Sequence, residues 1–153
     1  MRHALLLAAL ALASCSEEQS DADKLAAVER AQDIPAQAIE PQPIDYRDIE
    51  ANDLFGAGCN FSPDGGGMGA TVLAKPDVAH MKIDGEIERF APDVGAGSNP
   101  LDTWQKYDGT TASFRLELGE GDFDTGRYPG TLTMRDGQDR IVYRSGGSVQ
   151  CGS

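Results

Sequence analysis

His80 is the residue to examine first for chemistry, because imidazole is the side chain that most readily moves protons near neutral pH. The only other histidine is His3, close to the start of the chain. His80 alternates with Ala79 and Met81 along an expected strand, so it should lie on the opposite sheet face from these apolar residues. Neither Gly-x-Ser-x-Gly nor His-Glu-x-x-His surrounds it. We therefore predict a non-catalytic protein that needs no cofactor.

An acidic stretch near residue 120 is the next candidate. Phe123-Asp124-Thr125-Gly126 resembles the Asp-Thr-Gly loop of aspartic proteases, in which two aspartates share a proton. No second copy of the motif occurs, which favours a solvated turn. Glu120, Asp122 and Asp124 could offer oxygen ligands to calcium, but the loop lacks the spacing of an EF-hand. We expect weak adventitious binding there and no built metal site.

The longest irregular stretch, residues 92–110, contains the only tryptophan, Trp104, three residues before Tyr107. If both rings are exposed, they form an aromatic platform for a glycan or a protein partner. The alternative is that Trp104 fills the core. The small size of the domain favours the core, because few other large apolar groups are present to fill it.

The first fifteen residues have the pattern of a targeting segment. Arg2 and His3 precede an apolar run that begins at Ala4 and ends in Leu12-Ala13-Ser14-Cys15. A basic start, a short apolar run and small residues before a cleavage point are typical of a secretory signal, and the run is too short to span a bilayer. The pattern resembles the lipobox of bacterial lipoproteins.

That resemblance implies removal of residues 1–14 and lipidation of Cys15, which becomes the first residue of the mature chain. Several acyl chains would then anchor the protein to a membrane. Ser16 stands where an aspartate would indicate retention in the inner membrane, so the resemblance favours the outer membrane, facing the periplasm. The alternative is an ordinary cleaved signal with an incidental cysteine.

With Cys15 lipidated, two of the three cysteines remain, Cys59 and Cys151. An even pair in an oxidising compartment predicts a disulfide. Such a bond requires Cα atoms within about 7 Å, so the first and last expected strands should be neighbours. Two distant cysteines and one histidine do not make a zinc site.

The chain is strongly acidic, with a net charge of −12 that becomes −13 when Arg2 is removed with the signal. This charge repels phosphate backbones and excludes nucleic acid as a partner. It leaves cationic proteins, metal ions or simple solubility as reasons for the acidity.

Residues 15–44 read as an acidic, proline-containing tether. A marginal helix over residues 21–32 could be capped by Ser20, and three prolines then favour extended backbone. A second short helix is expected over residues 45–55, with Asp45 as its cap and Gly56 as its stop.

All 18 glycines follow residue 55, where they separate short β-rich runs. Alternation within these runs and Asp-Gly turns at residues 84, 108 and 136 indicate antiparallel strands. The expected strands are residues 57–61, 70–74, 78–83, 86–91, 111–118, 131–135, 140–144 and 148–151. The prediction is a mainly β domain over residues 45–153, a small antiparallel sandwich or barrel of about 7–8 short strands closed by one disulfide.

The most consistent functional hypothesis is a non-catalytic lipoprotein of the cell envelope that binds a protein or glycan or plays a structural part. One alternative is an inhibitor of a cationic hydrolase such as lysozyme, which so acidic a chain would attract. Residues 143–149 loosely resemble the Ser-Gly loop of lipoprotein lysozyme inhibitors, with Val149 where that family has tyrosine. Another alternative is an assembly subunit, which predicts an exposed apolar patch or a free strand edge.

Overall fold

The computed structural model describes residues 20–32, 35–67 and 69–153. The chain divides into two compact units, one ending at Pro35 and the other spanning Ala36–Ser153. In the first unit the described part is helix α1 (Asp21–Gln32). Its predicted cap is confirmed, because the backbone N–H of Asp23 donates to Ser20 Oγ at 3.2 Å. Cys15 and the signal lie outside the described residues.

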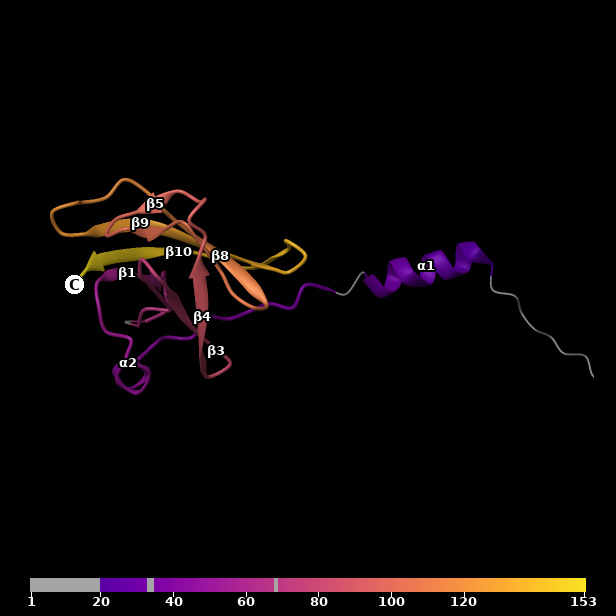
Figure 1. The fold of residues 1–153 in the computed structure, drawn as a ribbon, viewed down its shortest axis with the longest axis horizontal. Coiled ribbons are helices and arrows are strands. Elements are labelled where there is room, and N and C mark those ends of the chain that lie inside the picture. Colours follow the sequence, from indigo (N-terminus) through magenta and orange to yellow (C-terminus); the bar gives the residue numbers. More distant parts are fainter. Residues whose placement is uncertain (1–19, 33–34, 68) are drawn as a thin grey trace, which may run out of the picture. The chain divides into compact units, whose positions relative to one another are not determined.

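Eight antiparallel strands of the second unit form a closed barrel (Figure 1). The order around the barrel is β1, β10, β9, β8, β7, β4, β3 and β2, and β2 pairs again with β1. The strands are β1 (Gly58–Pro63), β2 (Val72–Ala74), β3 (Ala79–Ile83), β4 (Glu86–Pro92), β7 (Lys106–Asp108), β8 (Ala112–Leu118), β9 (Arg127–Asp136) and β10 (Ile141–Gly152). A separate two-stranded sheet contains β5 (Ser98–Asn99) and β6 (Thr103–Trp104). The predicted mainly β fold with antiparallel strands is confirmed.

Alternation along the strands fills the barrel with side chains. Phe114 and Leu116 of β8 are buried, whereas Arg115 between them is only partly covered. The ring of Phe114 stacks on Tyr107 and meets Phe90 edge to face, each at a centroid distance of 5.2 Å. Each fully buried side chain of this kind contributes about 1.5–3 kcal/mol through the hydrophobic effect. The interior is therefore a packed core.

The barrel closes where its first strand meets its last. β1 and β10 pair over six residues, from Gly58 opposite Gly152 to Pro63 opposite Gly147. Cys59 and Cys151 are partners in this register and form a disulfide, with their Cα atoms 4.0 Å apart. The predicted disulfide and the predicted contact of the terminal strands are both confirmed.

β10 is one continuous strand where the sequence predicted two strands separated by glycines. A Cβ on Gly147 would collide with the carbonyl oxygen of Ser62 and lie 2.7 Å from the ring of Phe61, which is fully buried. Glycine is therefore present at this position because the neighbouring strand and its ring approach closely, and not because the chain turns.

Residues 92–110 contain three short strands, β5, β6 and β7, where the sequence predicted an irregular stretch. β7 is only three residues long, too short for a visible alternation, yet it bridges β4 and β8. Without it the barrel would remain open.

The compact unit begins earlier than the predicted domain, which started at residue 45. Residues 36–45, which we call the strap, are bonded to the barrel at three points. The backbone N–H groups of Ile39, Gln42 and Ile44 donate to the carbonyl oxygens of Val142, Lys82 and Ala70 at 3.1, 2.8 and 2.8 Å. Most of the predicted tether after Pro35 therefore lies against the barrel.

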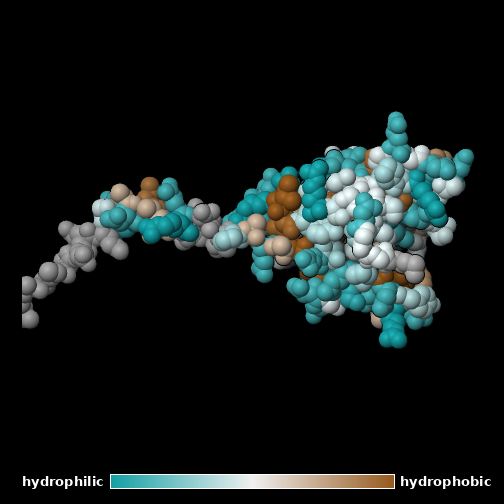
Figure 2. Space-filling view, turned by 180° about the vertical axis from the view of Figure 1, so that it is seen from behind, coloured by the Kyte–Doolittle hydropathy of each residue, from teal (hydrophilic) through white to brown (hydrophobic). Residues whose placement is uncertain are grey.

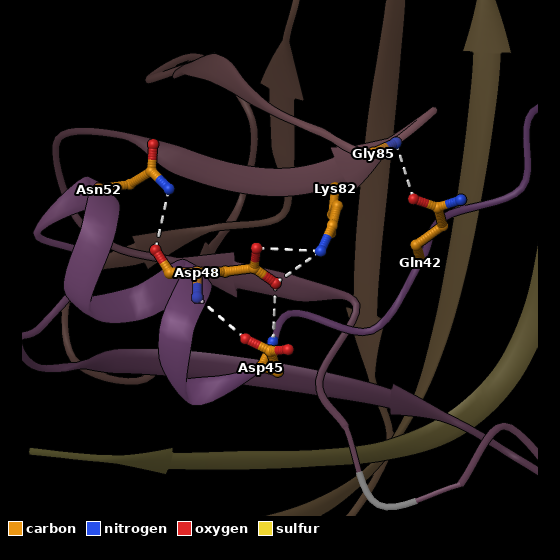
Figure 3. Close-up of polar contacts among 6 residues, drawn as sticks. All are labelled: Gln42, Asp45, Asp48, Asn52, Lys82 and Gly85. Carbon is orange, nitrogen blue, oxygen red and sulfur yellow. Dashed lines mark hydrogen bonds and ion pairs between the residues drawn. The ribbon is translucent and has the colours of Figure 1, made fainter.

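The strap leads into helix α2 (Tyr46–Asn52), which Figure 3 shows beside β3. The predicted cap is confirmed, since Asp45 and Asp48 each accept the other's backbone N–H at 3.0 Å. The carboxylate of Asp48 also binds Lys82 Nζ at 2.8 and 2.9 Å, and this contact lowers the pKa of Asp48. The helix ends at Asn52, before the predicted stop, because Asp53 adopts a left-handed conformation (φ 52°).

A second, smaller apolar cluster lies beneath α2. Leu54 and Ile44 are buried here with Leu73 of β2, and Ile49 and Ile87 pack against them. The strap and the helix thus cover part of the outer face of β2–β4.

Replacing both disulfide cysteines, as C59A/C151A, should lower the free energy of unfolding by about 2–5 kcal/mol, because the bond spans a separation of 92 residues and restricts the unfolded chain. Urea unfolding followed by Trp104 fluorescence would measure the loss, with reduction of the wild-type protein as a control. An unchanged midpoint in both experiments would contradict the structural role of the bond.

Gly147→Ala should destabilise the barrel by about 1–3 kcal/mol, because the new methyl group overlaps Ser62 and Phe61. Gly137→Ala is the matched control, since a Cβ at Gly137 has no atom within 4 Å. Thermal unfolding of the two variants would compare them. Equal stability would show that close approach does not require glycine in β10.

Candidate functional site

His80 is a buried side chain of β3. It lies opposite Leu73 and Arg89 in the strand register and is 5% exposed, and its Nδ1 has no hydrogen-bond partner among the described residues. Burial lowers the pKa of His80 below its usual 6.5, and the charges of Lys75 and Arg89 lower it further, against a smaller opposing effect of Asp77. The imidazole is therefore neutral at neutral pH. As predicted, it alternates with the core residues of its strand.

The exposed aromatic platform considered from the sequence is not formed. Tyr107 is fully buried, and its hydroxyl donates to the carbonyl oxygen of Lys75 at 2.8 Å and accepts the N–H of Trp104 at 3.0 Å. Burial raises the pKa of Tyr107 above its usual 10.0. Trp104 is partly buried against the core, and its Nε1 donates to the carbonyl oxygen of Pro76 at 3.0 Å. Trp104 therefore supports the core, the alternative that the size of the domain favoured.

The acidic loop is a turn held by its own side chains. Asp122 Oδ1 accepts the backbone N–H groups of Asp124 and Thr125 at 2.9 and 3.3 Å. Hydrogen bonds from Thr125 and Asp124 lower the pKa of Asp122. Glu120 and Asp124 are exposed, and no group of three metal-ligating side chains occurs among the described residues.

The structure has a groove on the outer face of β7–β10 that the sequence did not predict. We call it the arginine groove and define it by Arg115 of β8, Thr133 of β9 and Arg144 of β10, which follow one another in the strand register. Its volume is about 360 Å³. Neighbouring strands lie about 4.8 Å apart, so the two arginines project from backbones about 10 Å apart, with the threonine hydroxyl between them.

Two further cations line the groove, and each is neutralised by an acid. Lys106 Nζ lies 2.9 Å from Asp93 and 3.0 Å from Asp108, and these contacts raise the pKa of Lys106. Arg135 donates to the backbone oxygen of Asp139 at 2.6 Å and lies 3.6 Å from its carboxylate.

Arg115 and Arg144 differ from these two cations. Neither side chain makes a hydrogen bond or an ion pair within the part of the chain that the structure describes. Glu117 also lines the groove, exposed and without such a bond among the described residues. Ile141, 47% exposed, adds an apolar surface. The groove thus combines two free guanidinium groups, a hydroxyl and an apolar side chain.

The signal for this groove was partly present in the sequence. The Asp136-Gly137 turn predicts a hairpin, and pairing its strands places Thr133 close to Arg144. The exact pairing depends on a register shift between Ile141 and Tyr143, and no local pattern predicts it. The neighbour across the other side, Arg115, becomes visible only when β8 is known to pair with β9.

Exposed large apolar side chains are otherwise scattered. Figure 2 shows a mostly hydrophilic face with small separate hydrophobic areas. Tyr46 and Phe55, which meet edge to face at 6.4 Å, form one such exposed pair near α2. Among the described residues, no helix is long and apolar enough to cross a membrane.

The stability of wild-type protein should fall as the pH drops below 6.5. The unfolded chain takes up a proton on His80 near pH 6.5, whereas the folded chain does so only at lower pH, so acid favours unfolding in this interval. Well above pH 6.5 His80 is neutral in both the folded and the unfolded chain, so it does not make the free energy of unfolding depend on pH. His80→Leu should remove this slope between about pH 7 and 5, as thermal unfolding would show.

The described aspartates with lowered pKa values titrate below 3.8, outside that window, so they do not obscure the comparison. Parallel pH profiles of the wild type and His80→Leu would contradict the prediction.

Comparison with protein-family models, with curated proteins and with solved structures finds no match in any of the three.

Proposed function

We propose that this protein is a non-catalytic, lipid-anchored module of the bacterial cell envelope that binds its ligand on the outer surface of its barrel. The observation that carries the binding role is the arginine groove, with two guanidinium groups that have no partner among the described residues. Guanidinium groups that line one groove can each bind a carboxylate or phosphate oxygen of a ligand from outside the chain.

The packed interior supports binding on the outside. Phe61, Phe90, Tyr107 and Phe114 are all at most 1% exposed and occupy the centre of the barrel. Barrels of eight strands either fill with side chains, as here, or hold one small ligand inside. A ligand of this protein therefore has to bind at the surface.

The envelope location rests on Leu12-Ala13-Ser14-Cys15 and the preceding apolar run. The disulfide is consistent with it, since such bonds persist in oxidising compartments like the periplasm. A non-catalytic role is supported by His80, which is buried without a hydrogen-bonded acid at its Nδ1.

The two alternatives gain less support. Residues 143–149 lie within β10 and pair with β9, so they do not form the loop on which the lysozyme-inhibitor resemblance depends. The assembly alternative looked for a free strand edge, and the eight strands of the closed barrel offer none.

The anchor is tested by growing cells on an alkyne-labelled fatty acid and separating their membranes. The wild-type protein should carry the label and sediment with the membranes, whereas Cys15→Ala should lose the label and appear in the soluble fraction. Cys59→Ala is the control for loss of a different cysteine, and it should keep the label. An unlabelled wild-type protein would refute the lipid anchor.

A further inference from the structure

We infer that the arginine groove binds a small organic anion through a carboxylate or phosphate group. This inference rests on the proposed binding role and names the chemical class of its ligand. Arg115 and Arg144 supply the cationic donors, and Thr133 supplies a hydroxyl between them.

The geometry suits a planar or tetrahedral anion. A guanidinium group presents N–H donors in a fixed fork that matches two oxygens of a carboxylate or phosphate. Two such forks flank Thr133, so a single anionic group could contact both arginines and the hydroxyl. Half-burial of Arg115 reduces its exposure to water, which strengthens its charge–charge interactions.

Arg115 and Arg144 share their lack of an acidic partner among the described residues with other cations such as Arg89, but they are set apart by their positions on either side of Thr133 in one groove. Aspartate and glutamate total 25, against 13 lysines and arginines. Lys106 at one end of the groove has two such partners. Arg115 and Arg144 have none among the described residues, and this leaves their donors available to a ligand.

The size and the surrounding charge limit the ligand further. A volume of about 360 Å³ lies at the lower end of the range of about 300–1,000 Å³ for small-molecule sites. The net charge of −12 repels extended polyanions and anionic membrane surfaces, whereas a small anion enters the groove without facing the rest of the acidic surface. Exposed Ile141 fits a short apolar portion attached to the anionic group.

The test uses the protein purified from its expressing cells in a neutral detergent, titrated with inorganic phosphate, phenyl phosphate and hexanoate. Calorimetry should show saturable binding of at least one organic probe. Phenyl phosphate should bind more tightly than inorganic phosphate, because its ring can cover Ile141. The order of phenyl phosphate and hexanoate distinguishes a phosphate ligand from a carboxylate ligand. Higher salt should weaken each interaction.

Substitutions inside and outside the arginine groove test whether the anion binds there. R115Q/R144Q should weaken binding roughly tenfold or more, because hydrogen bonds between charged groups are lost. Glu117→Gln should strengthen it, since a nearby negative charge is removed. The matched control R47Q/R89Q makes the same change in net charge at two exposed positions outside the groove and should leave affinity within about twofold.

Trp104 fluorescence during thermal unfolding verifies that each variant is folded. The inference is overturned if no organic probe binds saturably, or if R115Q/R144Q binds as tightly as the wild type. An equal loss in R47Q/R89Q would also overturn it, because binding would then follow net charge. The fatty-acid labelling experiment is independent, so failure at the groove leaves the anchor standing, and the reverse also holds.

Discussion

The pairing of β1 with β10 is the constraint on which the rest of the structure depends. It joins the two ends of the sheet, and the disulfide between Cys59 and Cys151 fixes it covalently within the register. A closed sheet buries one face of every strand, so the large apolar side chains fill the interior. The outer face of the barrel is then left for recognition, so a binding surface depends on which parts of that face other elements cover.

The two halves of that outer face differ. Over β2–β4 the strap and α2 cover part of the sheet, with Leu54 and Leu73 in a second apolar cluster and Asp48 bound to Lys82. The buried, neutral imidazole of His80 belongs to this covered half. Over β7–β10 lies the arginine groove, which opens to solvent. A binding surface is therefore expected away from the strands that carry His80, the residue considered first for chemistry.

The features that the sequence predicted correctly depend on residues close together in the chain or on cysteine chemistry. Asp84-Gly85 adopts positive φ at both positions, as a two-residue hairpin turn requires, and the capping residues of both helices are where the sequence placed them. The even number of cysteines left after Cys15 correctly predicted a disulfide between two residues 92 positions apart, and with it the contact of the first and last strands. The sequence wrongly predicted a break between two strands at Gly147. A glycine that is needed because an aromatic ring packs against the backbone cannot be distinguished in sequence from a glycine that is needed for a turn. β7 and the groove depend on long-range pairing, which short patterns do not contain.

The charge distribution connects the fold with the proposed setting. Anionic lipid head groups would repel an acidic barrel, so the proposed lipid anchor and the protein surface would act in opposite directions on its distance from the bilayer. The same repulsion would lower the local concentration of free anions around the domain. Arg115 and Arg144 have no acidic partner among the described residues, and their charges act over a distance comparable to the Debye length of about 8 Å at physiological salt. Under the proposed binding role, the groove would select anions by size. A small anion can stay close to Arg115 and Arg144, whereas a larger anion would also approach the surrounding carboxylates.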